Sequence, residues 1–131
     1  MKLRPIGRVA GAQVGGRSEI DVLPEYAEGL YRIEELDRLV VLFLFDRSDK
    51  VELKVHPRGD PMNPLVGVFA SRSPDRPNHI GMTVVRLVEV RGNILVVDGL
   101  DAWEGTPVLD IKPDVQGWGP TCPRDRLDGK D

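Results

Sequence analysis

The sequence is poor in cysteine and has no long apolar run, and each absence narrows what the protein can be. Its 131 residues contain one cysteine, Cys122. A single cysteine makes neither an internal disulfide nor a cysteine-rich zinc site, so we expect a reducing compartment. No segment is long enough to span a bilayer, and the N-terminus MKLRPIGRVA lacks the apolar region of a signal peptide. We therefore expect a cytoplasmic protein that does not engage a membrane.

Recognisable phosphate-binding, metal-binding and catalytic motifs are also missing. The stretch "GAQVGGRS", residues 11–18, nearly fits a phosphate-binding loop, but the strand-like "EIDVL" follows where a helix is required. His56 and His79 have no partner at metal-ligand spacing, so we expect no metal. Regular alternation of strands and helices is absent too, which excludes a Rossmann fold.

Basic residues are slightly outnumbered: 18 against 21 acidic residues give a formal net charge of −3. This balance argues against a bulk nucleic-acid binder. Residues 50–81 depart from it, because they hold five basic residues against three acidic ones, together with both histidines. On charge alone this is an ordinary solvated surface, and the alternative is a local patch for an anionic partner.

Most of the chain consists of short apolar or alternating runs that are typical of β-strands. The run "LVVLFLF", residues 39–45, predicts a strand buried on both faces. One helix is predicted over residues 25–36, where Leu30, Ile33 and Leu36 have helical spacing after Pro24. The other predicted strands cover residues 6–9, 19–22, 51–55, 65–70, 83–90, 94–97 and 106–111.

Many short strands with one short helix predict a mainly β protein, a small antiparallel β-barrel. The length suits a single domain, which we place at residues 1–116. Residues 117–131 are rich in glycine, proline and charge, and we expect an irregular tail there.

A rigid polar loop, "SRSPDRPNHIG", interrupts the strands at residues 71–81. Two prolines restrict its backbone, so it loses little entropy when it holds a ligand. Arg72 and Arg76 offer planar donor pairs for a carboxylate or phosphate, and Asn78 offers a donor and an acceptor that suit an adenine edge. The alternative is a structural loop whose arginines donate to backbone carbonyls, and the loop alone does not decide between the two.

The wider sequence decides the matter by a resemblance. The stretches "GVFASRSPDRPNHIGMTVVRLVEV", residues 67–90, and "LDAWEGTPVLDIKP", residues 100–113, resemble the TrmO family. Its members are S-adenosylmethionine-dependent tRNA adenosine N6-methyltransferases, and the resemblance extends over residues 3–113. It implies a non-Rossmann β-barrel that forms a homodimer with a shared cofactor site. It also implies a tRNA partner, methylated on a threonylcarbamoyl-modified adenosine beside the anticodon.

The resemblance also implies site residues, while the catalytic base remains unassigned. The cofactor S-adenosyl-L-methionine is expected to contact Arg72, Met82 and the segment Asp101, Ala102, Trp103, Glu104. Asp46 and Arg47 stand where the family has a cofactor-contacting His-Gln pair. For the anticodon loop of the tRNA, we expect contacts from Arg58, Arg76, Asn78 and Lys112.

Two alternatives stay open beside tRNA methylation. One is a methyltransferase for another small substrate, suggested by the acidic body of the chain. The other is a module that binds S-adenosylmethionine without transferring its methyl group. Asp114, which replaces a tyrosine of the family pattern, and the short loop after the first strand suggest this second alternative.

Overall fold

The structure, a computed structural model, describes residues 1–115 and is built on a closed six-stranded barrel. The order around the barrel is β1-β2-β7-β6-β3-β8, and all neighbouring strands are antiparallel. This confirms the mainly β, barrel-forming class predicted from the sequence. Its strands are β1 (Gly7–Ala10), β2 (Arg17–Val22), β3 (Arg38–Leu44), β6 (Ile80–Arg91), β7 (Ile94–Asp98) and β8 (Pro107–Pro113).

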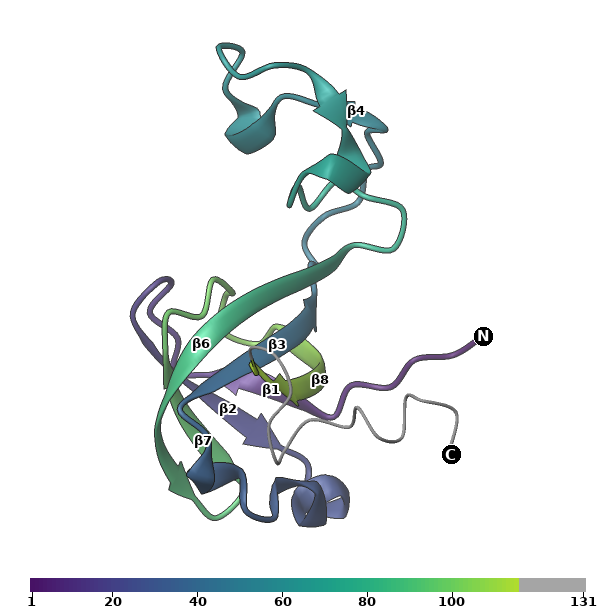
Figure 1. Cartoon of the computed structure of the whole chain (residues 1–131). Helices are drawn as coiled ribbons and strands as arrows, with labels where there is room; N and C mark the ends of the chain where they lie inside the picture. Colours follow the sequence, from purple (N-terminus) through teal and green to yellow (C-terminus); the bar gives the residue numbers. More distant parts are fainter. Residues whose placement is uncertain (116–131) are drawn as a thin grey trace, which may run out of the picture.

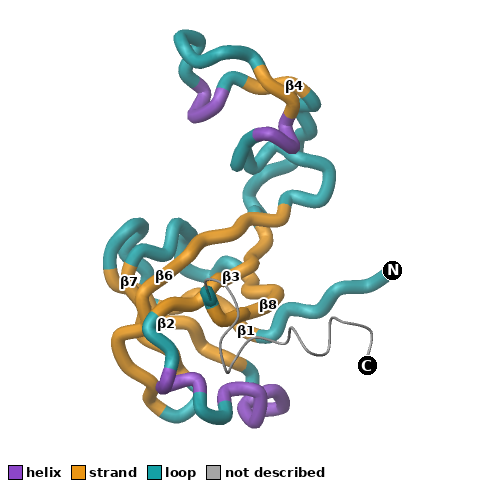
Figure 2. Tube along the Cα trace, in the orientation of Figure 1, coloured by secondary structure: helices purple, strands orange, loops and turns teal. Residues whose placement is uncertain are grey.

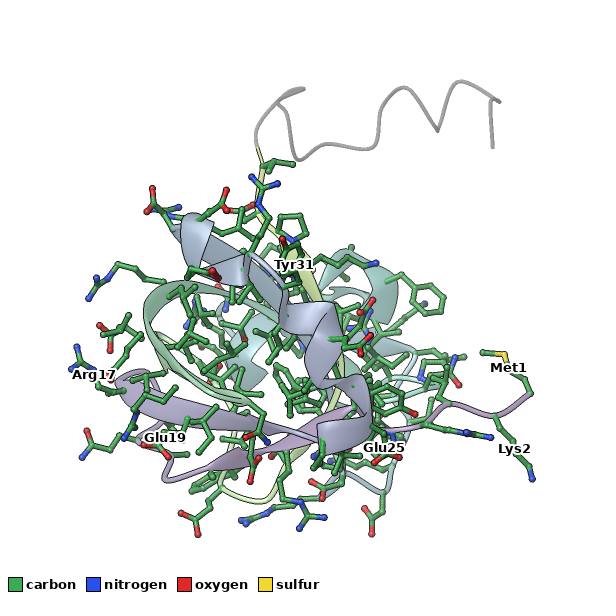
Figure 3. The ribbon with its side chains drawn as sticks, turned by 90° about the horizontal axis from the view of Figure 1, so that it is seen from below. Met1, Lys2, Arg17, Glu19, Glu25 and Tyr31 are labelled. Atoms are coloured by element: carbon green, nitrogen blue, oxygen red, sulfur yellow. The ribbon has the colours of Figure 1, made fainter. Side chains whose placement is uncertain are left out.

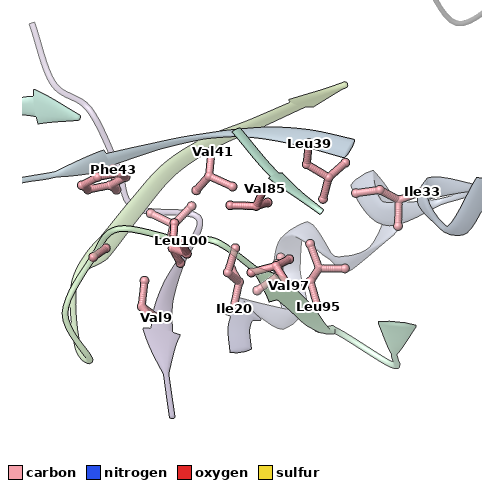
Figure 4. Close-up of a cluster of buried hydrophobic side chains, with 13 residues drawn as sticks. Val9, Ile20, Ile33, Leu39, Val41, Phe43, Val85, Leu95, Val97 and Leu100 are labelled. Carbon is pink, nitrogen blue, oxygen red and sulfur yellow. The ribbon is translucent and has the colours of Figure 1, made fainter. Parts of the chain in front are cut away.

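The core of the barrel is filled by apolar side chains, most of them from alternate positions of these strands (Figure 4). In β3, for example, Leu39, Val41 and Phe43 are almost completely buried. Leu100 and Ala102, from the segment after β7, are buried in the same cluster. The core therefore includes Ala102, one of the residues that are expected from the sequence to contact the cofactor.

The outer face of β3 differs from the prediction of a strand buried on both faces. Val40, Leu42 and Leu44 point away from the core and are half-buried. On the adjoining β6, Met82 is 40% exposed and Val84 is 43% exposed. The prediction is wrong for this face because, among residues 1–115, the barrel has no second layer packed over these strands.

The predicted helix at residues 25–36 is present as two short 3₁₀ helices, η1 (Pro24–Leu30) and η2 (Ile33–Glu35). Between them Arg32 has a left-handed φ of 67°, which interrupts the helical path. The apolar spacing of three residues explains the outcome, because side chains at i and i+3 align in a 3₁₀ helix. Ile33 closes this end of the core, while Tyr31 is 84% exposed and points into solvent (Figure 3).

Residues 46–79 form an arm that stands away from the barrel between β3 and β6 (Figure 1; Figure 2). It contains the strands β4 (Lys54–Val55) and β5 (Val66–Gly67) and the 3₁₀ turns η3 (Pro57–Gly59) and η4 (Val68–Ala70). The predicted strands at residues 51–55 and 65–70 are therefore wrong for most of their length, because Val68 is the only buried apolar side chain of residues 46–79 and longer strands would have little to pack against.

In the part of the chain that the structure describes, no helix is long and apolar enough to cross a membrane. The predicted tail, residues 117–131, lies outside the described residues.

Candidate functional site

Three segments distant in sequence meet where β3 leaves the barrel, and they enclose a cavity of about 500 Å³. They are the end of β3 with its following loop, the loop at residues 71–79 (the RSP loop), and the segment after β7. A volume between roughly 300 and 1,000 Å³ is typical of small-molecule sites. We call this the barrel-end cavity, and it is lined by Phe43, Leu44, Phe45, Asp46, Arg47, Ser48, Asp49, Lys50, Arg72, Pro74, Asp75, Asp101, Ala102, Trp103 and Thr106.

Two aromatic rings give the cavity part of its apolar wall. Phe43 and Phe45 pack edge to face, with ring centroids 5.2 Å apart and an interplanar angle of 75°. Gly81 pairs with Phe43 across the β3–β6 ladder, and a Cβ there would lie 2.6 Å from the Phe43 ring. Glycine at this position therefore makes room for the aromatic pair.

Trp103 and Arg47 form the second aromatic feature. The guanidinium carbon of Arg47 lies 5.0 Å from the centroid of the Trp103 ring, a cation–π arrangement. Trp103 is 60% exposed, so its ring is accessible to a ligand. The pair connects the loop after β3 to the segment after β7, and thereby joins two walls of the cavity.

The RSP loop is held by its own side chains. Arg76 donates from Nη1 to the carbonyl oxygens of Ser71 (3.0 Å) and Ser73 (3.1 Å). His79 Nδ1 lies 2.8 Å from the Pro74 carbonyl oxygen, which can only accept, so this nitrogen carries the hydrogen. These contacts fit the structural interpretation of Arg76 that the sequence left open. Its contact with substrate stays a prediction.

Arg72 differs from Arg76 because most of its donors have no partner among the residues that the structure describes. It is exposed, and its Nη1 donates to the main-chain carbonyl of Met82 over 3.1 Å. This bond anchors the side chain to the first residues of β6. Arg72 lines the cavity, where its remaining N–H groups suit a carboxylate.

Asp75 ties the RSP loop to the loop after β3. Its carboxylate accepts from Ser48 Oγ at 3.0 Å and lies 3.8 Å from Lys50 Nζ. Its main-chain carbonyl accepts from the amide of Glu52 over 2.8 Å. Asp75 thus fixes the relative position of two cavity walls, a role that the sequence did not reveal.

The cavity gathers six of the eight residues predicted to contact the cofactor: Asp46, Arg47, Arg72, Asp101, Ala102 and Trp103. Met82 and Glu104 do not line it. The Met82 side chain is on the outer face of the barrel, and only its carbonyl contacts Arg72. Glu104 lies in the exposed turn just beyond Trp103.

The residues predicted to contact tRNA are more scattered. Arg58 lies on the arm, and Asn78 is exposed on the RSP loop. Lys112 is not with them: it pairs with Val40 on the outside of β8 and forms an ion pair with Asp110. It lines a different hollow, near Tyr31 and Ile33 at the other end of β3. The fold therefore does not place all four residues on one face.

Sequence reasoning missed several residues of the cavity, among them Phe43, Phe45, Ser48 and Thr106. The phenylalanines belong to an apolar run whose pattern predicts burial and carries no sign of a ligand site. The one weak sign of a ligand site was that this apolar run lies directly before a polar loop.

In the described part of the chain, no group of three or more His, Cys, Asp or Glu residues is placed to hold a metal ion.

The fold and site together define a closed antiparallel β-barrel with a cavity among the loops at one end. Comparison with known proteins identifies the family. Residues 5–118 match the model of the tRNA-methyltransferase O N-terminal domain. The chain therefore belongs to the TrmO family.

The individual relatives agree with this assignment. A probable S-adenosyl-L-methionine-binding protein of Methanocaldococcus jannaschii is 44% identical over 114 residues, covering 84% of this chain and 89% of the relative. A putative S-adenosylmethionine-dependent methyltransferase of Pseudomonas aeruginosa is 43% identical over 103 residues, covering 76% and 45%.

Solved structures named TrmO share the fold. One matches with a TM-score of 0.71 and 32% identity, covering 88% of this chain and 57% of that one. The TrmO structure from Pseudomonas aeruginosa matches with a TM-score of 0.69 and 31% identity, covering 88% and 55%. The present chain thus spans little more than half the length of these proteins.

Proposed function

We propose that the protein is an S-adenosylmethionine-dependent methyltransferase that methylates N6 of a threonylcarbamoyl-modified adenosine next to a tRNA anticodon. The observation that carries the proposal is the barrel-end cavity, in which Arg72 and the segment Asp101–Trp103 converge in a chain of the TrmO family. Relatives named as S-adenosylmethionine-binding proteins support the choice of cofactor.

The residues present in the cavity fit this cofactor. An adenine ring needs a flat apolar surface, and the accessible ring of Trp103 offers one. A carboxylate needs a donor pair, which Arg72 supplies. Asp46 and Asp101 offer acceptors for ribose hydroxyls or an ammonium group. The cavity thus contains counterparts for the adenine, for the carboxylate and for the ribose or ammonium group of S-adenosylmethionine.

The protein contributes mainly position to methyl transfer. When bound, S-adenosylmethionine supplies a methyl group activated by its sulfonium. The hydrogen bond from Ser48 to Asp75 and the hydrogen bonds of Arg76 fix the cavity walls before any ligand binds. Such preorganisation lowers the entropic cost of aligning two reactants, which is a major source of rate in displacement reactions.

The homodimer with a shared cofactor site is part of the proposal. The apolar side chains of the arm are widely exposed: Leu53 is 65% exposed, Leu65 55%, Phe69 78% and Met62 89%. The arm also stands away from the barrel, and residues 1–115 leave these side chains uncovered (Figure 1). A second copy would bury them and place its surface beside the RSP loop at the base of the arm.

A second candidate function is a module that binds S-adenosylmethionine without transferring its methyl group. The names of several relatives, which specify binding only, favour it. A methyltransferase of another small substrate remains the third candidate, because the net charge of −3 disfavours RNA.

Methyl transfer from labelled S-adenosylmethionine separates the three candidates. The protein is incubated with tRNA that carries the threonylcarbamoyl group, with the same tRNA lacking it, and with no tRNA. We expect label in the first sample alone. Cofactor binding by calorimetry without label in any sample would favour the binding module. Label in neither tRNA but in a small-molecule extract would favour the other substrate.

A further inference from the structure

Arg58, in the arm, is held in a backbone conformation that arginine disfavours. Its φ is 60° and its ψ is 17°, in the left-handed region. A non-glycine residue adopts this region at a cost, and such residues concentrate at functional sites. Gly59, which follows, has a φ of 67° without that cost. The strain at Arg58 would be relieved by glycine, yet the chain carries a long cationic side chain there.

The surrounding turn imposes this conformation. The Gly59 amide donates to the His56 carbonyl over 2.8 Å, which closes the turn. His56 Nδ1 lies 2.8 Å from the Asn63 carbonyl oxygen, and Asn63 Nδ2 donates to the Pro57 carbonyl over 2.7 Å. Side chains on both flanks thus hold the backbone of Arg58, so its orientation is built into the arm.

Arg58 lines a second cavity of about 650 Å³, which we call the arm groove. The arm groove adjoins the barrel-end cavity, because Arg72, Pro74, Asp75 and Asp101 line both. A ligand in the groove would therefore lie directly beside a ligand in the cavity. This is the arrangement that a transfer between two bound molecules requires.

Charge is distributed unevenly along the arm groove. Lys54, His56 and Arg58 lie on its arm side, which also carries Glu52. Among residues 1–115 no acidic side chain pairs with Arg58 or Lys54, whereas Asp75, on the wall shared with the cavity, is engaged by Ser48 and Lys50. Cationic donors thus remain available at the end of the groove away from the cavity.

We propose that the arm groove is the methyl-acceptor site and that Arg58, with Lys54, binds an anionic group of the acceptor. The proposal rests on the proposed function, because it takes the barrel-end cavity as the cofactor site. A guanidinium offers paired donors that match a carboxylate or a phosphate. In the proposed tRNA substrate both exist: the carboxylate of the threonylcarbamoyl group and the phosphates of the anticodon loop.

The test compares Arg58→Gly with Arg32→Gly. Both replace an exposed arginine at positive φ, at 60° and 67°, and both remove one charge. Arg32 lies at the other end of the barrel, beside η2. Binding of anticodon-loop RNA hairpins, with and without the threonylcarbamoyl group, is followed by fluorescence anisotropy across a salt series without cofactor. Thermal unfolding and S-adenosylmethionine affinity are measured in parallel.

We expect Arg58→Gly to weaken RNA binding about tenfold while the melting temperature stays equal or rises, because strain is relieved. Arg32→Gly should bind RNA as the wild type does. If Arg58 binds a phosphate, both hairpins lose affinity and the log–log salt slope falls by about 0.7. If it binds the carboxylate, only the modified hairpin loses affinity. Equal affinities in wild type and Arg58→Gly for both hairpins would overturn the proposal.

A separate measurement keeps the groove testable if tRNA is not the substrate. Inorganic phosphate is titrated while the imidazole resonances of His56 are followed by NMR. Suppose that the wild-type protein binds neither hairpin, but that phosphate shifts the His56 resonances saturably and Arg58→Gly abolishes this shift. The groove would then still be an anion site, and tRNA would be excluded as the acceptor. If the wild-type protein shows neither RNA binding nor such a shift, both the anion site and the tRNA acceptor are contradicted.

Discussion

Gly81 faces Phe43 across the β3–β6 ladder, and a Cβ on Gly81 would lie 2.6 Å from the Phe43 ring and 2.8 Å from that of Phe45. Both rings line the barrel-end cavity, and neither can withdraw without disturbing the edge-to-face contact between them. The absence of one methyl group at the start of β6 therefore sets the shape of the candidate cofactor site.

The first prediction concerns this contact. Gly81→Ala should lower the free energy of unfolding by about 1–3 kcal/mol, because the rings must leave their preferred positions. S-adenosylmethionine affinity should fall as well. Urea denaturation and calorimetry measure the two effects. Gly67→Ala is the matched control, since a Cβ there would lie 3.9 Å from the nearest atom, the Leu53 carbonyl oxygen. Equal stability of the two variants would contradict the packing argument.

The second prediction concerns Arg72. Arg72→Ala should weaken S-adenosylmethionine binding by about 1.5–3 kcal/mol, which is typical of a charge-assisted hydrogen bond. Stability should change little, since the side chain is exposed and, within residues 1–115, its one hydrogen bond is to the Met82 carbonyl. Calorimetry on the folded variant measures the affinity. An unchanged affinity would reassign Arg72 to holding the start of β6.

The third prediction concerns pH and the outer face of the barrel. Asp98 accepts hydrogen bonds from Arg17 and Arg86, and these contacts hold the pKa of its carboxyl group below the ordinary value of an aspartate. A depressed pKa means that the folded state favours the charged form. The stabilisation is therefore complete above the ordinary aspartate pKa and is lost as pH falls through the lowered value.

Wild type should consequently be more stable than Asp98→Asn at pH 7, with a difference that shrinks in strong acid and in high salt. Urea denaturation over a pH series measures it. Glu28→Gln is the control, at an exposed acid that forms none of the ion pairs among residues 1–115. A difference that stays constant from neutral pH to strong acid would show that the ion pairs do not contribute.

The fourth prediction concerns assembly. A symmetric dimer that covers the arm should be weakened by Phe69→Ser, because Phe69 is 78% exposed in a single chain. Tyr31→Ser removes a comparably exposed aromatic ring at the other end of the barrel and should leave the dimer intact. Light scattering at micromolar concentration measures the mass. A wild-type monomer that binds the cofactor fully would contradict the shared site.

The sequence predicted the barrel because its strands alternate or run apolar over the correct lengths, as Leu39, Val41 and Phe43 illustrate. It did not predict the arm, where "VELKV" alternates like a strand but has no core beneath it. Strand propensity depends on the local sequence, whereas burial depends on the whole fold. The same reason explains residues 25–36, whose three-residue apolar spacing fits an α-helix and a 3₁₀ helix alike.

Residues of the candidate site could be predicted where they belong to a sequence motif. They could not be predicted where only the fold brings them to the site. Arg72 and Trp103 lie in recognisable stretches of sequence, and the cavity contains both. Asp75 acquires its importance from three-dimensional contacts. Arg58 was expected from the sequence to contact tRNA, but its backbone angle and the groove that it lines come from the fold alone. Neither feature leaves a trace in the spacing of residues along the chain.

The fluorescence of Trp103 during a titration with S-adenosylmethionine tests the location of the cofactor most directly. In a Trp118→Phe variant Trp103 is the only tryptophan, and its ring is 60% exposed at the cavity. We expect its emission to change saturably, with the dissociation constant obtained by calorimetry, and its quenching by acrylamide to decrease as the cofactor covers the ring. Calorimetric binding with no change in Trp103 emission or quenching would place the cofactor elsewhere and contradict the assignment of the barrel-end cavity.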